Sequence, residues 1–596
     1  MKVTTKLYQL ICLSALIGIS GAGFCQQTNW DKGQTFTEAN DPLRTDNKNW
    51  LQVKPGLHSS FVTIDQRYAK SEVPKVKMER SAQVVGWRGE RLSVQLLLWT
   101  ADSIPGLKVT VSDFKSKKGK TLKSIAYARF QRYVLTDEYG SGRACGKRNA
   151  ADFPSSLSAD MLDDLSSFNL ERKKVRPVWI TIEIPRKAKQ GSYSATVQVT
   201  SRQGKQQKLN LSLDVIGQLL PEVSSWSFHL DQWQHPSAVA RINKLPVWSG
   251  AHFEAMKPQI QLLANAGQKV ITATLNKDPW HVQTFDPYED MIIWTKEKDG
   301  SWSYNYRVFD KWVSFMMGLG IKKMINCYSI VPWNNEIHYK DAITSKFVNV
   351  VAKPGTQAFT DMWEPFLKDF AKHLEQKGWL EITNIALDER NKEDMGLAFA
   401  LIEKVAPKLG VAYADNQKTY KRYTNSDDVS TAVQHPIDAN DIAERRNKGL
   451  NTTFYIYCGN SFPNQFTFSD PAESAYLGWY TLATGYNGVL RWAYNSWVEN
   501  PLIDSRFRTW PAGDTYITYP QARSSIRYER LLEGIQDYEK VLVVKHMLEQ
   551  KNDLVTLKKL NDAIDKLKSY SRYDGWNSDL NTAKQLLNSI SVSLSK

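Results

Sequence analysis

The spacing of apolar residues changes once along this chain, near residue 220, and this change limits the fold more than any other feature. Between about residues 92 and 215, apolar residues occupy every second position. Such alternation is typical of strands that turn one face to a core and the other to water. Turn-forming segments at 185–191 and 203–205 separate successive runs, so the pattern predicts consecutive antiparallel strands of a β-sandwich. The alternating apolar positions are Val178, Ile180, Ile182 and Ile184, then Tyr193, Ala195, Val197 and Val199, then Leu209, Leu211, Leu213 and Val215.

After Gly217 and Pro221, short apolar segments alternate with longer stretches of helical pattern, as in parallel βα units. Eight such segments predict a (β/α)₈ barrel of about 300 residues. The predicted strands are 228–230, 270–275, 324–330, 382–387, 411–414, 429–433, 453–457 and 489–492. Helices are expected between several of them, for example at 362–377 and 395–405. Segments 526–547 and 554–590 are amphipathic, and we expect them to pack as helices on the outside of the barrel.

The predicted fold is therefore multidomain, with α and β structure in an N-terminal β-sandwich followed by a TIM-like barrel and C-terminal helices. The expected boundaries are 1–25 for a signal peptide and 26–220 for the sandwich. The catalytic barrel is expected at 221–545, and the helices that pack on it at 546–596.

The first 25 residues have the pattern of an export signal. Lys2 and Lys6 precede an apolar run at 7–19 that is too short to span a bilayer, and small residues follow it. Cleavage is expected after Ala22 or after Cys25, and lipidation of Cys25 is an alternative that the preceding Phe24 disfavours. No later run approaches 18 apolar residues, so we expect no transmembrane segment. The protein is expected in the periplasm or outside the cell, with a surface lipoprotein as the alternative.

Charge and cysteine content exclude several classes of function. The formal charge of +15 falls to +13 without Lys2 and Lys6, but the basic residues are spread along the chain. Dense clusters such as 115–120 carry no interleaved aromatic residues, so we do not expect nucleic-acid binding. Beyond the signal, Cys145, Cys327 and Cys458 have no short spacing, and the nine histidines form no close pairs. We therefore expect neither a metal site nor a disulfide framework, and no cofactor.

Aromatic and polar residues follow the predicted barrel strands, where barrel enzymes place their chemistry. The chain contains 20 Trp, 26 Tyr and 22 Phe, more than a core alone tends to need. Acids, amides and aromatic rings on one rim are typical of a sugar site, because rings stack on pyranose faces and amides bind hydroxyls. The candidates at strand ends are Asp231, Trp233, Trp280, Asp388, Glu389, Tyr457, Asn460, Trp492 and Tyr494.

The adjacent pair Asp388-Glu389 is the main catalytic candidate. Two neighbouring carboxylates at a buried strand end repel each other, so one pKa should rise, and a raised Glu389 pKa suits a general acid. Neighbours on one strand diverge, so they cannot easily flank the anomeric carbon as acid and nucleophile. The pair fits a substrate-assisted mechanism better, in which the 2-acetamido oxygen of an N-acetylhexosamine attacks C1. Asp388 would then hold the acetamido N–H, and Glu389 would protonate the leaving group.

The Asp388-Glu389 pair belongs to a series of ordered sequence blocks. These blocks are 385–389, 406–410, 488–495, 510–514, 519–520, 525–529 and 533–539, with 177–179 and 191–193 in the sandwich. In this order they resemble glycoside hydrolase family 123 along nearly the whole mature chain, except that Arg390 stands where we expect proline. The resemblance implies a sandwich plus barrel, and a retaining, substrate-assisted, exo-acting β-N-acetylgalactosaminidase without a cofactor. It assigns the family's Asp-Glu pair to Asp388 and Glu389.

The other candidates receive weaker roles. Trp492 and Tyr494 would form walls of the acetamido pocket, and Tyr457 would donate its hydroxyl to the acetamido oxygen. Sugar hydroxyls or stacking are the expected roles of Asn460, Asp231, Trp233 and Trp280. We expect Arg527 and Glu529 to form a structural pair that holds the last helix to the barrel.

Two alternatives remain open from the sequence. One is a β-N-acetylglucosaminidase or broader hexosaminidase on the same scaffold, because the two sugars differ in one hydroxyl orientation. The other is a non-catalytic glycan-binding surface protein. The expected partner of the enzyme is a glycan or glycolipid headgroup with terminal N-acetylgalactosamine.

Overall fold

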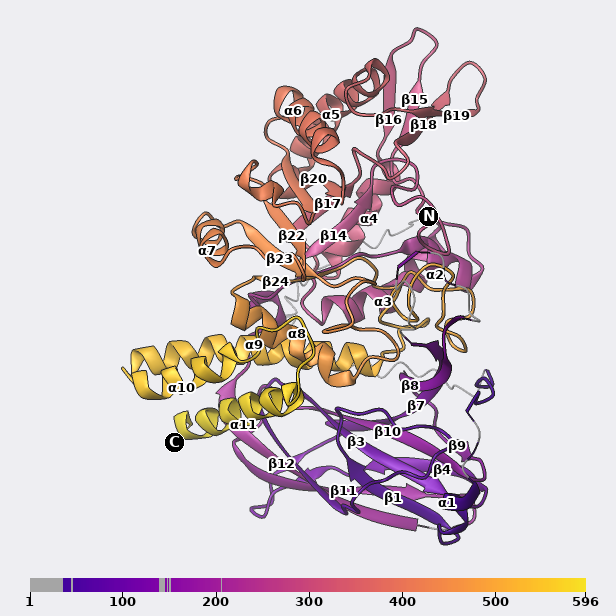
Figure 1. Ribbon diagram of the computed structural model, residues 1–596, viewed down its shortest axis with the longest axis vertical. Coiled ribbons are helices and arrows are strands. Elements are labelled where there is room, and N and C mark those ends of the chain that lie inside the picture. Colours follow the sequence, from indigo (N-terminus) through magenta and orange to yellow (C-terminus); the bar gives the residue numbers. More distant parts are fainter. Residues whose placement is uncertain are drawn as a thin grey trace, which may run out of the picture.

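The computed structural model describes residues 36–595, except 44, 46, 139–144, 147, 149–151 and 205. The predicted signal peptide and Cys25 lie outside the described residues. A strand-rich domain lies at the bottom of Figure 1 and a barrel lies at the top, with the C-terminal helices between them. The last strand of the first domain ends at Leu219, and the first barrel strand begins at His229.

The N-terminal domain is a sandwich of two sheets, as the sequence predicts. One sheet has five strands in the order β1-β3-β10-β7-β8, and the other has the order β2-β12-β11-β4-β9, with β5 and β6 at one side. Most neighbours are antiparallel, but β2 and β12 are parallel. The strands are β1 (Leu57–Val62), β2 (Ser81–Arg88), β3 (Arg91–Thr100), β4 (Ile104–Val111), β5 (Phe114–Lys115), β6 (Thr121–Leu122), β7 (Ala126–Asp137), β8 (Ser155–Asp163), β9 (Phe168–Leu170), β10 (Lys174–Glu183), β11 (Gly191–Thr200) and β12 (Gln206–Leu219); a short helix, α1 (Asn47–Leu51), precedes them.

The predicted alternation is confirmed on the inner faces, where the apolar positions of β10, β11 and β12 form one buried cluster. The outer face of the five-stranded sheet is buried as well. There Trp179 packs with Leu162 and with Ile526 of α9 (Ile526–Gln550). Helix α9 therefore covers one part of this outer face, and residues between Trp50 and Val76 cover another part, around Leu97 and Trp99.

The second domain is a barrel of eight parallel strands in the order β13-β24-β23-β22-β21-β20-β17-β14. It closes between β13 and β14, where Leu230 bridges Gln268 and its carbonyl accepts a hydrogen bond from Lys269 N at 2.9 Å. All eight predicted strands occur, each with ends within two residues of the expected ones. They are β13 (His229–Gln232), β14 (Val270–Thr274), β17 (Met324–Tyr328), β20 (Thr383–Asp388), β21 (Gly410–Ala414), β22 (Asp428–Ala432), β23 (Asn451–Tyr455) and β24 (Gly488–Arg491).

Helices join most of the barrel strands, and a short 3₁₀ turn, η4 (Thr419–Lys421), lies between β21 and β22. The predicted helices at 362–377 and 395–405 are confirmed as parts of α5 and α6. The helices of this part of the chain are α2 (Pro236–Asn243), α3 (Gly250–Ala264), α4 (Arg307–Gly318), α5 (Gln357–Lys377), α6 (Lys392–Val405), α7 (Ala439–Asn447) and α8 (Pro471–Thr484).

Long insertions after β14 and β17 form a four-stranded sheet that the sequence did not predict. Its order is β16-β15-β18-β19, and it projects from the barrel at the upper right of Figure 1. The strands are β15 (Ile293–Lys296), β16 (Trp302–Asn305), β18 (Glu336–Asp341) and β19 (Phe347–Val351). They are four to six residues long, so any alternation of apolar residues covers too few positions to be recognised.

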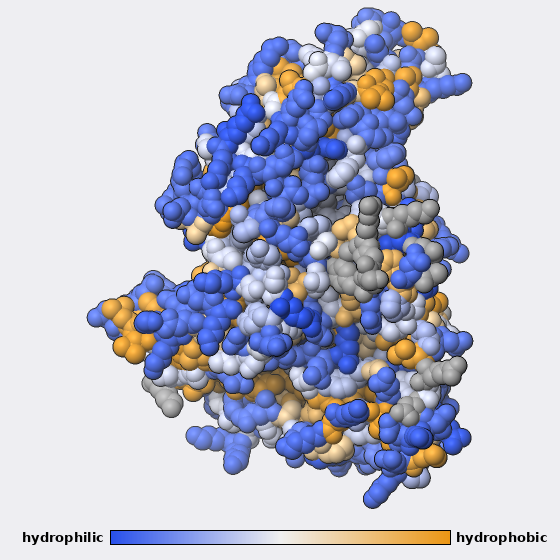
Figure 2. All heavy atoms as spheres, in the orientation of Figure 1, coloured by the Kyte–Doolittle hydropathy of each residue, from blue (hydrophilic) through white to orange (hydrophobic). Residues whose placement is uncertain are grey.

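The C-terminal segments are helical as expected, and α9 is followed by α10 (Leu554–Asp565) and α11 (Trp576–Leu594). The predicted boundary between residues 545 and 546 falls inside α9. Figure 2 shows a mostly hydrophilic surface on the face in view, with apolar side chains near the free end of α10, where Leu554 and Val555 are exposed. Among the described residues, none of the helices has the length and apolar character that crossing a membrane requires.

Helix α9 lies between the two domains and contacts both of them, whereas the sequence predicted contacts with the barrel only. Arg527 and Glu529 do not pair with each other, because residues two apart on a helix point to different sides. Each binds the sandwich instead. Arg527 Nη2 lies 2.8 Å from Asp160, and Glu529 accepts hydrogen bonds from Arg91 Nε and Arg129 Nη2 at 2.9 and 3.0 Å. Buried ion pairs of this kind fix the two domains in one relative orientation.

Candidate active site

A cavity of about 310 Å³ opens at the carboxyl ends of the barrel strands. Its lining residues are Cys145, Trp233, Gln283, Trp333, Asp388, Glu389, Ala414, Tyr455, Tyr457, Cys458, Leu490, Trp492, Trp510 and Asp514. Most of these are aromatic or acidic, the composition expected for a sugar site.

The cavity exists because side chains of very different size share the barrel interior. Three neighbouring strands, β20, β21 and β22, contribute only alanines to the buried cluster beneath the cavity. The remaining strands and their loops contribute Trp233, Trp280, Tyr328 and Tyr455 to the same cluster. The small alanine side chains leave a space that the aromatic side chains do not fill.

Asp388 and Glu389 both line the cavity, although neighbours on one strand normally point apart. Asp388 is the last residue of β20, and Glu389 follows it with a φ of +46°. The Glu389 backbone N–H donates to Ala414 O at 2.9 Å, which anchors this turn to the next strand. A left-handed conformation costs a non-glycine residue roughly 1–2 kcal/mol, so its presence here points to a functional requirement. The expectation that the two side chains diverge is therefore wrong at this position.

Two indole groups hold Asp388. Trp280 Nε1 and Trp333 Nε1 each donate to Asp388 Oδ2 at 3.0 Å. Behind them, the Trp280 ring packs on Trp233, and the Arg390 guanidinium lies 4.6 Å from the Trp333 ring centre. Arg390, the residue found where proline was expected, therefore supports a tryptophan that orients Asp388.

Burial and the nearby Glu389 charge raise the pKa of Asp388 to about 7, against the opposing effect of the two indole hydrogen bonds and Arg390. The sequence predicted a raised pKa within this pair but assigned it to Glu389. The two carboxylates accept hydrogen bonds from different groups: Asp388 accepts two from indole N–H groups, and Glu389 Oε1 accepts one from the Tyr455 hydroxyl. Near neutral pH, Asp388 is therefore close to the midpoint of its titration, so a large share of the molecules carry a proton on this carboxyl group.

Four of the predicted substrate-binding residues lie at or directly behind the cavity. Trp492 and Trp233 line it, and Trp492 packs edge-on against Trp510 with ring centres 5.8 Å apart. Tyr457 also lines it, with its hydroxyl donating to Gln434 Oε1 at 2.9 Å. Trp280 touches the site through its hydrogen bond to Asp388.

Three predicted residues lie elsewhere. Tyr494 is fully buried and its hydroxyl donates to Gln259 O at 2.9 Å, because the chain leaves β24 after Arg491 and the strand alternation no longer applies. The Asn460 carbonyl accepts a hydrogen bond from Asn464 Nδ2 at 2.7 Å, within the loop that follows β23.

Asp231 is the third of these residues, and it lies in the barrel interior below the cavity. It is 1% exposed. Burial, and then the nearby Asp428, raise its pKa well above the usual range. It is a buried acid of the barrel core and does not line the cavity.

Several cavity residues were not assigned from the sequence. Trp333 follows a predicted strand and Tyr455 lies two residues before Tyr457 on the same strand face, so both were within reach of the pattern. Asp514 was seen only as part of a sequence block. It is 1% exposed, and burial raises its pKa to about 6 while Arg491 Nη2 lies 3.6 Å from its Oδ1.

The expectation of no disulfide is wrong. Cys145 of the sandwich and Cys458, the residue after Tyr457, form a disulfide across a separation of 313 residues, and both line the cavity. Close by, Arg148 N donates to Arg508 O at 2.7 Å. The sandwich domain therefore supplies part of one cavity wall. Cys327 is free and buried.

In the described part of the chain, three or more His, Cys, Asp or Glu side chains nowhere gather so that they could hold a metal ion. The chemistry available in the cavity is thus that of two adjacent carboxylates, a third buried carboxylate, and aromatic walls.

Comparisons with known proteins place this geometry in context. Residues 233–544 match the glycoside hydrolase 123 catalytic domain, and residues 61–201 match the glycoside hydrolase 123 N-terminal domain. No curated protein matches the chain. A family 123 glycoside hydrolase from Clostridium perfringens, whose structure is described in terms of glycolipid glycan hydrolysis, is 28% identical, with a TM-score of 0.81. The match covers 90% of this chain and 99% of that one.

More distant structures share little with this chain. A xyloglucanase of Bacteroides ovatus is 10% identical over 76% of this chain and 98% of that one, with a TM-score of 0.30. A maltogenic α-amylase from Thermotoga neapolitana is 8% identical over 53% of this chain and 77% of that one, with a TM-score of 0.31. Neither similarity is large enough to carry an argument. The two domain matches and the Clostridium perfringens structure show that this chain belongs to glycoside hydrolase family 123 and is a glycosidase.

Proposed function

We propose that this glycosidase removes terminal β-linked N-acetylgalactosamine from the non-reducing end of glycans, with retention of configuration and with the substrate's own acetamido group as nucleophile. One observation carries the proposal: Asp388 and Glu389 are adjacent and line the same cavity, and the pKa of Asp388 is raised to about 7. Neighbouring carboxylates are poorly placed to act from opposite sides of an anomeric carbon, but they are well placed to act on the acetamido group and the leaving oxygen.

Asp388 is the group that positions the acetamido nucleophile. Its Oδ2 accepts both indole N–H groups, and no described residue donates a hydrogen bond to Oδ1. The free oxygen can accept the acetamido N–H and favour the positive charge that develops as the acetamido oxygen bonds to C1. Binding of that N–H favours ionised Asp388, so the proton of the pair moves to Glu389.

Glu389 is the general acid and base. As the C1–O bond to the leaving group breaks, Glu389 gives its proton to the departing oxygen while the C1–O bond of the oxazoline forms. A water molecule then attacks C1, Glu389 takes its proton, and the oxazoline C1–O bond breaks to regenerate the acetamide. Two displacements at C1 leave the product in the β configuration. The Tyr455 hydroxyl supports ionised Glu389 after the first step.

Asp514 makes one alternative mechanism conceivable, because it places a third carboxylate in the cavity, away from the Asp388-Glu389 pair in the sequence. In a double displacement with an enzyme nucleophile, Asp514 would attack C1 and the acetamido group would be unnecessary. Its buried position near Arg491 suits a different role, that of acceptor for sugar hydroxyls. Orientation of the C4 hydroxyl against such a fixed acceptor would separate N-acetylgalactosamine from N-acetylglucosamine.

The natural substrate that we propose is a glycolipid headgroup or a similar glycan. Support comes from the description of the Clostridium perfringens relative and from shared family membership. We also propose that the protein is exported to the periplasm or beyond, either freely or as a lipoprotein attached through Cys25. The Cys145–Cys458 disulfide supports export, because such bonds persist in oxidising compartments.

The proton shared by the pair predicts a pH dependence. The raised pKa of Asp388 means that the free enzyme keeps this proton below about pH 7 and loses it above. We expect kcat/KM to fall about tenfold per pH unit above pH 7, measured with an aryl glycoside. Tryptophan fluorescence at each pH controls for unfolding, and a flat profile up to about pH 9 would contradict this assignment.

The test of the proposed function is hydrolysis of three p-nitrophenyl glycosides in parallel: the β-N-acetylgalactosaminide, the β-N-acetylglucosaminide and the plain β-galactoside. Turnover of only the first is expected. Equal turnover of both N-acetyl sugars would replace the specificity with that of a general hexosaminidase. Turnover of the β-galactoside would disprove the substrate-assisted mechanism and favour Asp514 as nucleophile, since that sugar lacks an acetamido group.

A further inference from the structure

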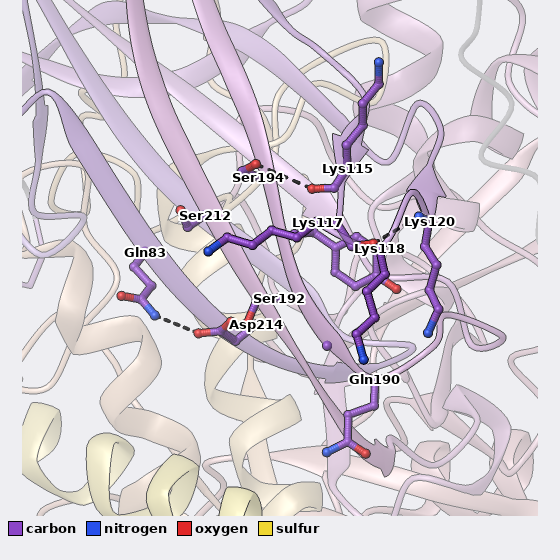
Figure 3. Close-up of a pocket in the computed structure, with 13 residues that line it drawn as sticks. Gln83, Lys115, Lys117, Lys118, Lys120, Gln190, Ser192, Ser194, Ser212 and Asp214 are labelled. Atoms are coloured by element: carbon purple, nitrogen blue, oxygen red, sulfur yellow. Dashed lines mark hydrogen bonds between the residues drawn. The ribbon is translucent and has the colours of Figure 1, made fainter.

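A second and larger hollow, of about 570 Å³, lies on the sandwich domain (Figure 3). It occupies the face of the seven-stranded sheet that points away from the sandwich core. Its residues Ser192 and Ser194 alternate along β11 with the core residues Tyr193 and Ala195. We call this hollow the lysine groove, after Lys115 at the end of β5 and three further lysines in the connection between β5 and β6.

The floor of the lysine groove is low and polar because serines occupy three neighbouring positions on β11 and β12. Gln83, Ser212, Ser194 and Lys115 are successive partners on β2, β12, β11 and β5, so they form one row across the sheet. Ser192 lies beside this row, opposite Asp214. Serines leave the sheet surface low and present hydroxyl groups upward, which gives both the depth and the hydrogen-bonding character of the groove.

The wall of the lysine groove is strongly basic. Lys115 of β5 and Lys117, Lys118 and Lys120 of the β5–β6 connection are all exposed, and Figure 3 shows their side chains extending in different directions at the edge of the hollow. In the described part of the chain, no carboxylate lies within ion-pair distance of these four side chains. The one acid in the lining, Asp214, accepts a hydrogen bond from Gln83 Nε2 at 2.7 Å. The groove therefore presents a net positive field with hydroxyl and amide groups beneath it.

This chemistry selects an anionic chain and, among anionic chains, a polysaccharide. Single-stranded nucleic acid needs exposed rings for base stacking, and the one aromatic residue in the lining, Tyr193, is 3% exposed with its hydroxyl bonded to Lys189 O at 2.7 Å. A bilayer surface needs apolar side chains that insert, and the groove lining has none exposed. Sulfate or carboxylate groups on a sugar chain match both the lysine wall and the serine floor.

We propose that the lysine groove binds an anionic polysaccharide through sulfate or carboxylate groups, at a site separate from the catalytic cavity. The five-stranded sheet and helix α9 lie between this face and the barrel. Binding in the groove and hydrolysis in the cavity can therefore proceed at the same time. The groove would hold the enzyme on a polyanionic surface while the barrel acts on neutral or charged glycans nearby.

The experiment measures binding of the full-length mature enzyme to heparin and to chondroitin sulfate by titration calorimetry at low salt. The quadruple variant Lys115→Gln, Lys117→Gln, Lys118→Gln and Lys120→Gln is expected to bind at least about tenfold more weakly. The matched control replaces four exposed lysines near the C-terminal helices, Lys551, Lys559, Lys566 and Lys568, by glutamine. It has the same net charge and is expected to bind within about twofold of the wild type.

Hydrolysis of the small aryl glycoside should be unchanged in both variants, which separates this test from that of the catalytic mechanism. An equal loss of binding in the two variants would show that net charge alone attracts the polysaccharide and would overturn the proposal, as would a failure of the wild type to bind. Tighter binding to single-stranded DNA or to anionic lipid vesicles than to either polysaccharide would overturn the assignment of the ligand.

Discussion

Replacing Glu389 with glutamine is expected to lower kcat by about 10³-fold on glycans with poor leaving groups, because proton transfer to the glycosidic oxygen is lost. For a dinitrophenyl glycoside, the rate of the first step, in which the oxazoline forms, should fall much less, because this leaving group needs little protonation. Azide should then restore turnover of that substrate, since an anionic nucleophile needs no general base in the second step. The measurement is kcat for both leaving groups, with and without azide.

Asp388→Asn should behave differently, although the two residues are neighbours. Asparagine cannot stabilise the positive charge of the oxazoline, so kcat should fall by about 10²–10³-fold for good and poor leaving groups alike. Azide should not rescue it. Glu393→Gln, at an exposed carboxylate on the following helix, is the matched control and should retain wild-type activity. Identical leaving-group dependence in the two variants would show that the roles of acid and positioning residue are not divided as proposed.

The fold was predictable because its two hydrophobic periods are long and regular. Alternate residues of β10, β11 and β12 enter one core. Most residues of each barrel strand are buried, and the strands recur between helical segments. The projecting sheet of β15, β16, β18 and β19 was missed for the opposite reason. Its strands are only four to six residues long, so tertiary pairing rather than local pattern defines them.

The place of Asp388 and Glu389 at a strand end was predictable from the sequence, but the cavity around them was not. Its space comes from alanines that lie beside one another only in the folded barrel, where Asp388 on β20 is in register with Ala414 on β21. Tyr494 shows the limit of strand alternation, since the pattern fails as soon as the chain leaves β24. The left-handed backbone of Glu389 is also invisible in the sequence, because glutamate seldom adopts it.

The domain interface explains why acids and bases of α9 were misassigned. Arg527 and Glu529 are close in sequence, which suggests a local pair, but their partners Asp160, Arg91 and Arg129 come from a domain more than 300 residues earlier. Long-range partners of this kind leave no signal in one sequence. The same reasoning applies to Cys145 and Cys458, whose separation hid a disulfide between the sandwich and the barrel.

Loss of this disulfide should have the largest effect on stability. For a loop of 313 residues, the entropy lost by the unfolded chain corresponds to a stabilisation of roughly 5 kcal/mol. We expect Cys145→Ser and Cys458→Ser each to lower the free energy of unfolding by about this amount, seen as a lower urea midpoint by tryptophan fluorescence. The double variant should lose no more than either single variant, because both changes remove the same link.

The function should suffer as well, because the two cysteines form part of the cavity wall beside Tyr457 and Trp510. Without the link, the sandwich segment that carries Cys145 is held to the barrel there mainly by contacts such as Arg148 N to Arg508 O. KM for an extended glycan should therefore rise in the folded variants, while kcat for the aryl glycoside should change little, since Asp388 and Glu389 are held by Trp280, Trp333 and Tyr455. Reductant should shift the wild type towards the variants and leave the double variant unchanged. Additive losses in the double variant, or a wild type indifferent to complete reduction, would show that the disulfide does not join the domains in the folded enzyme.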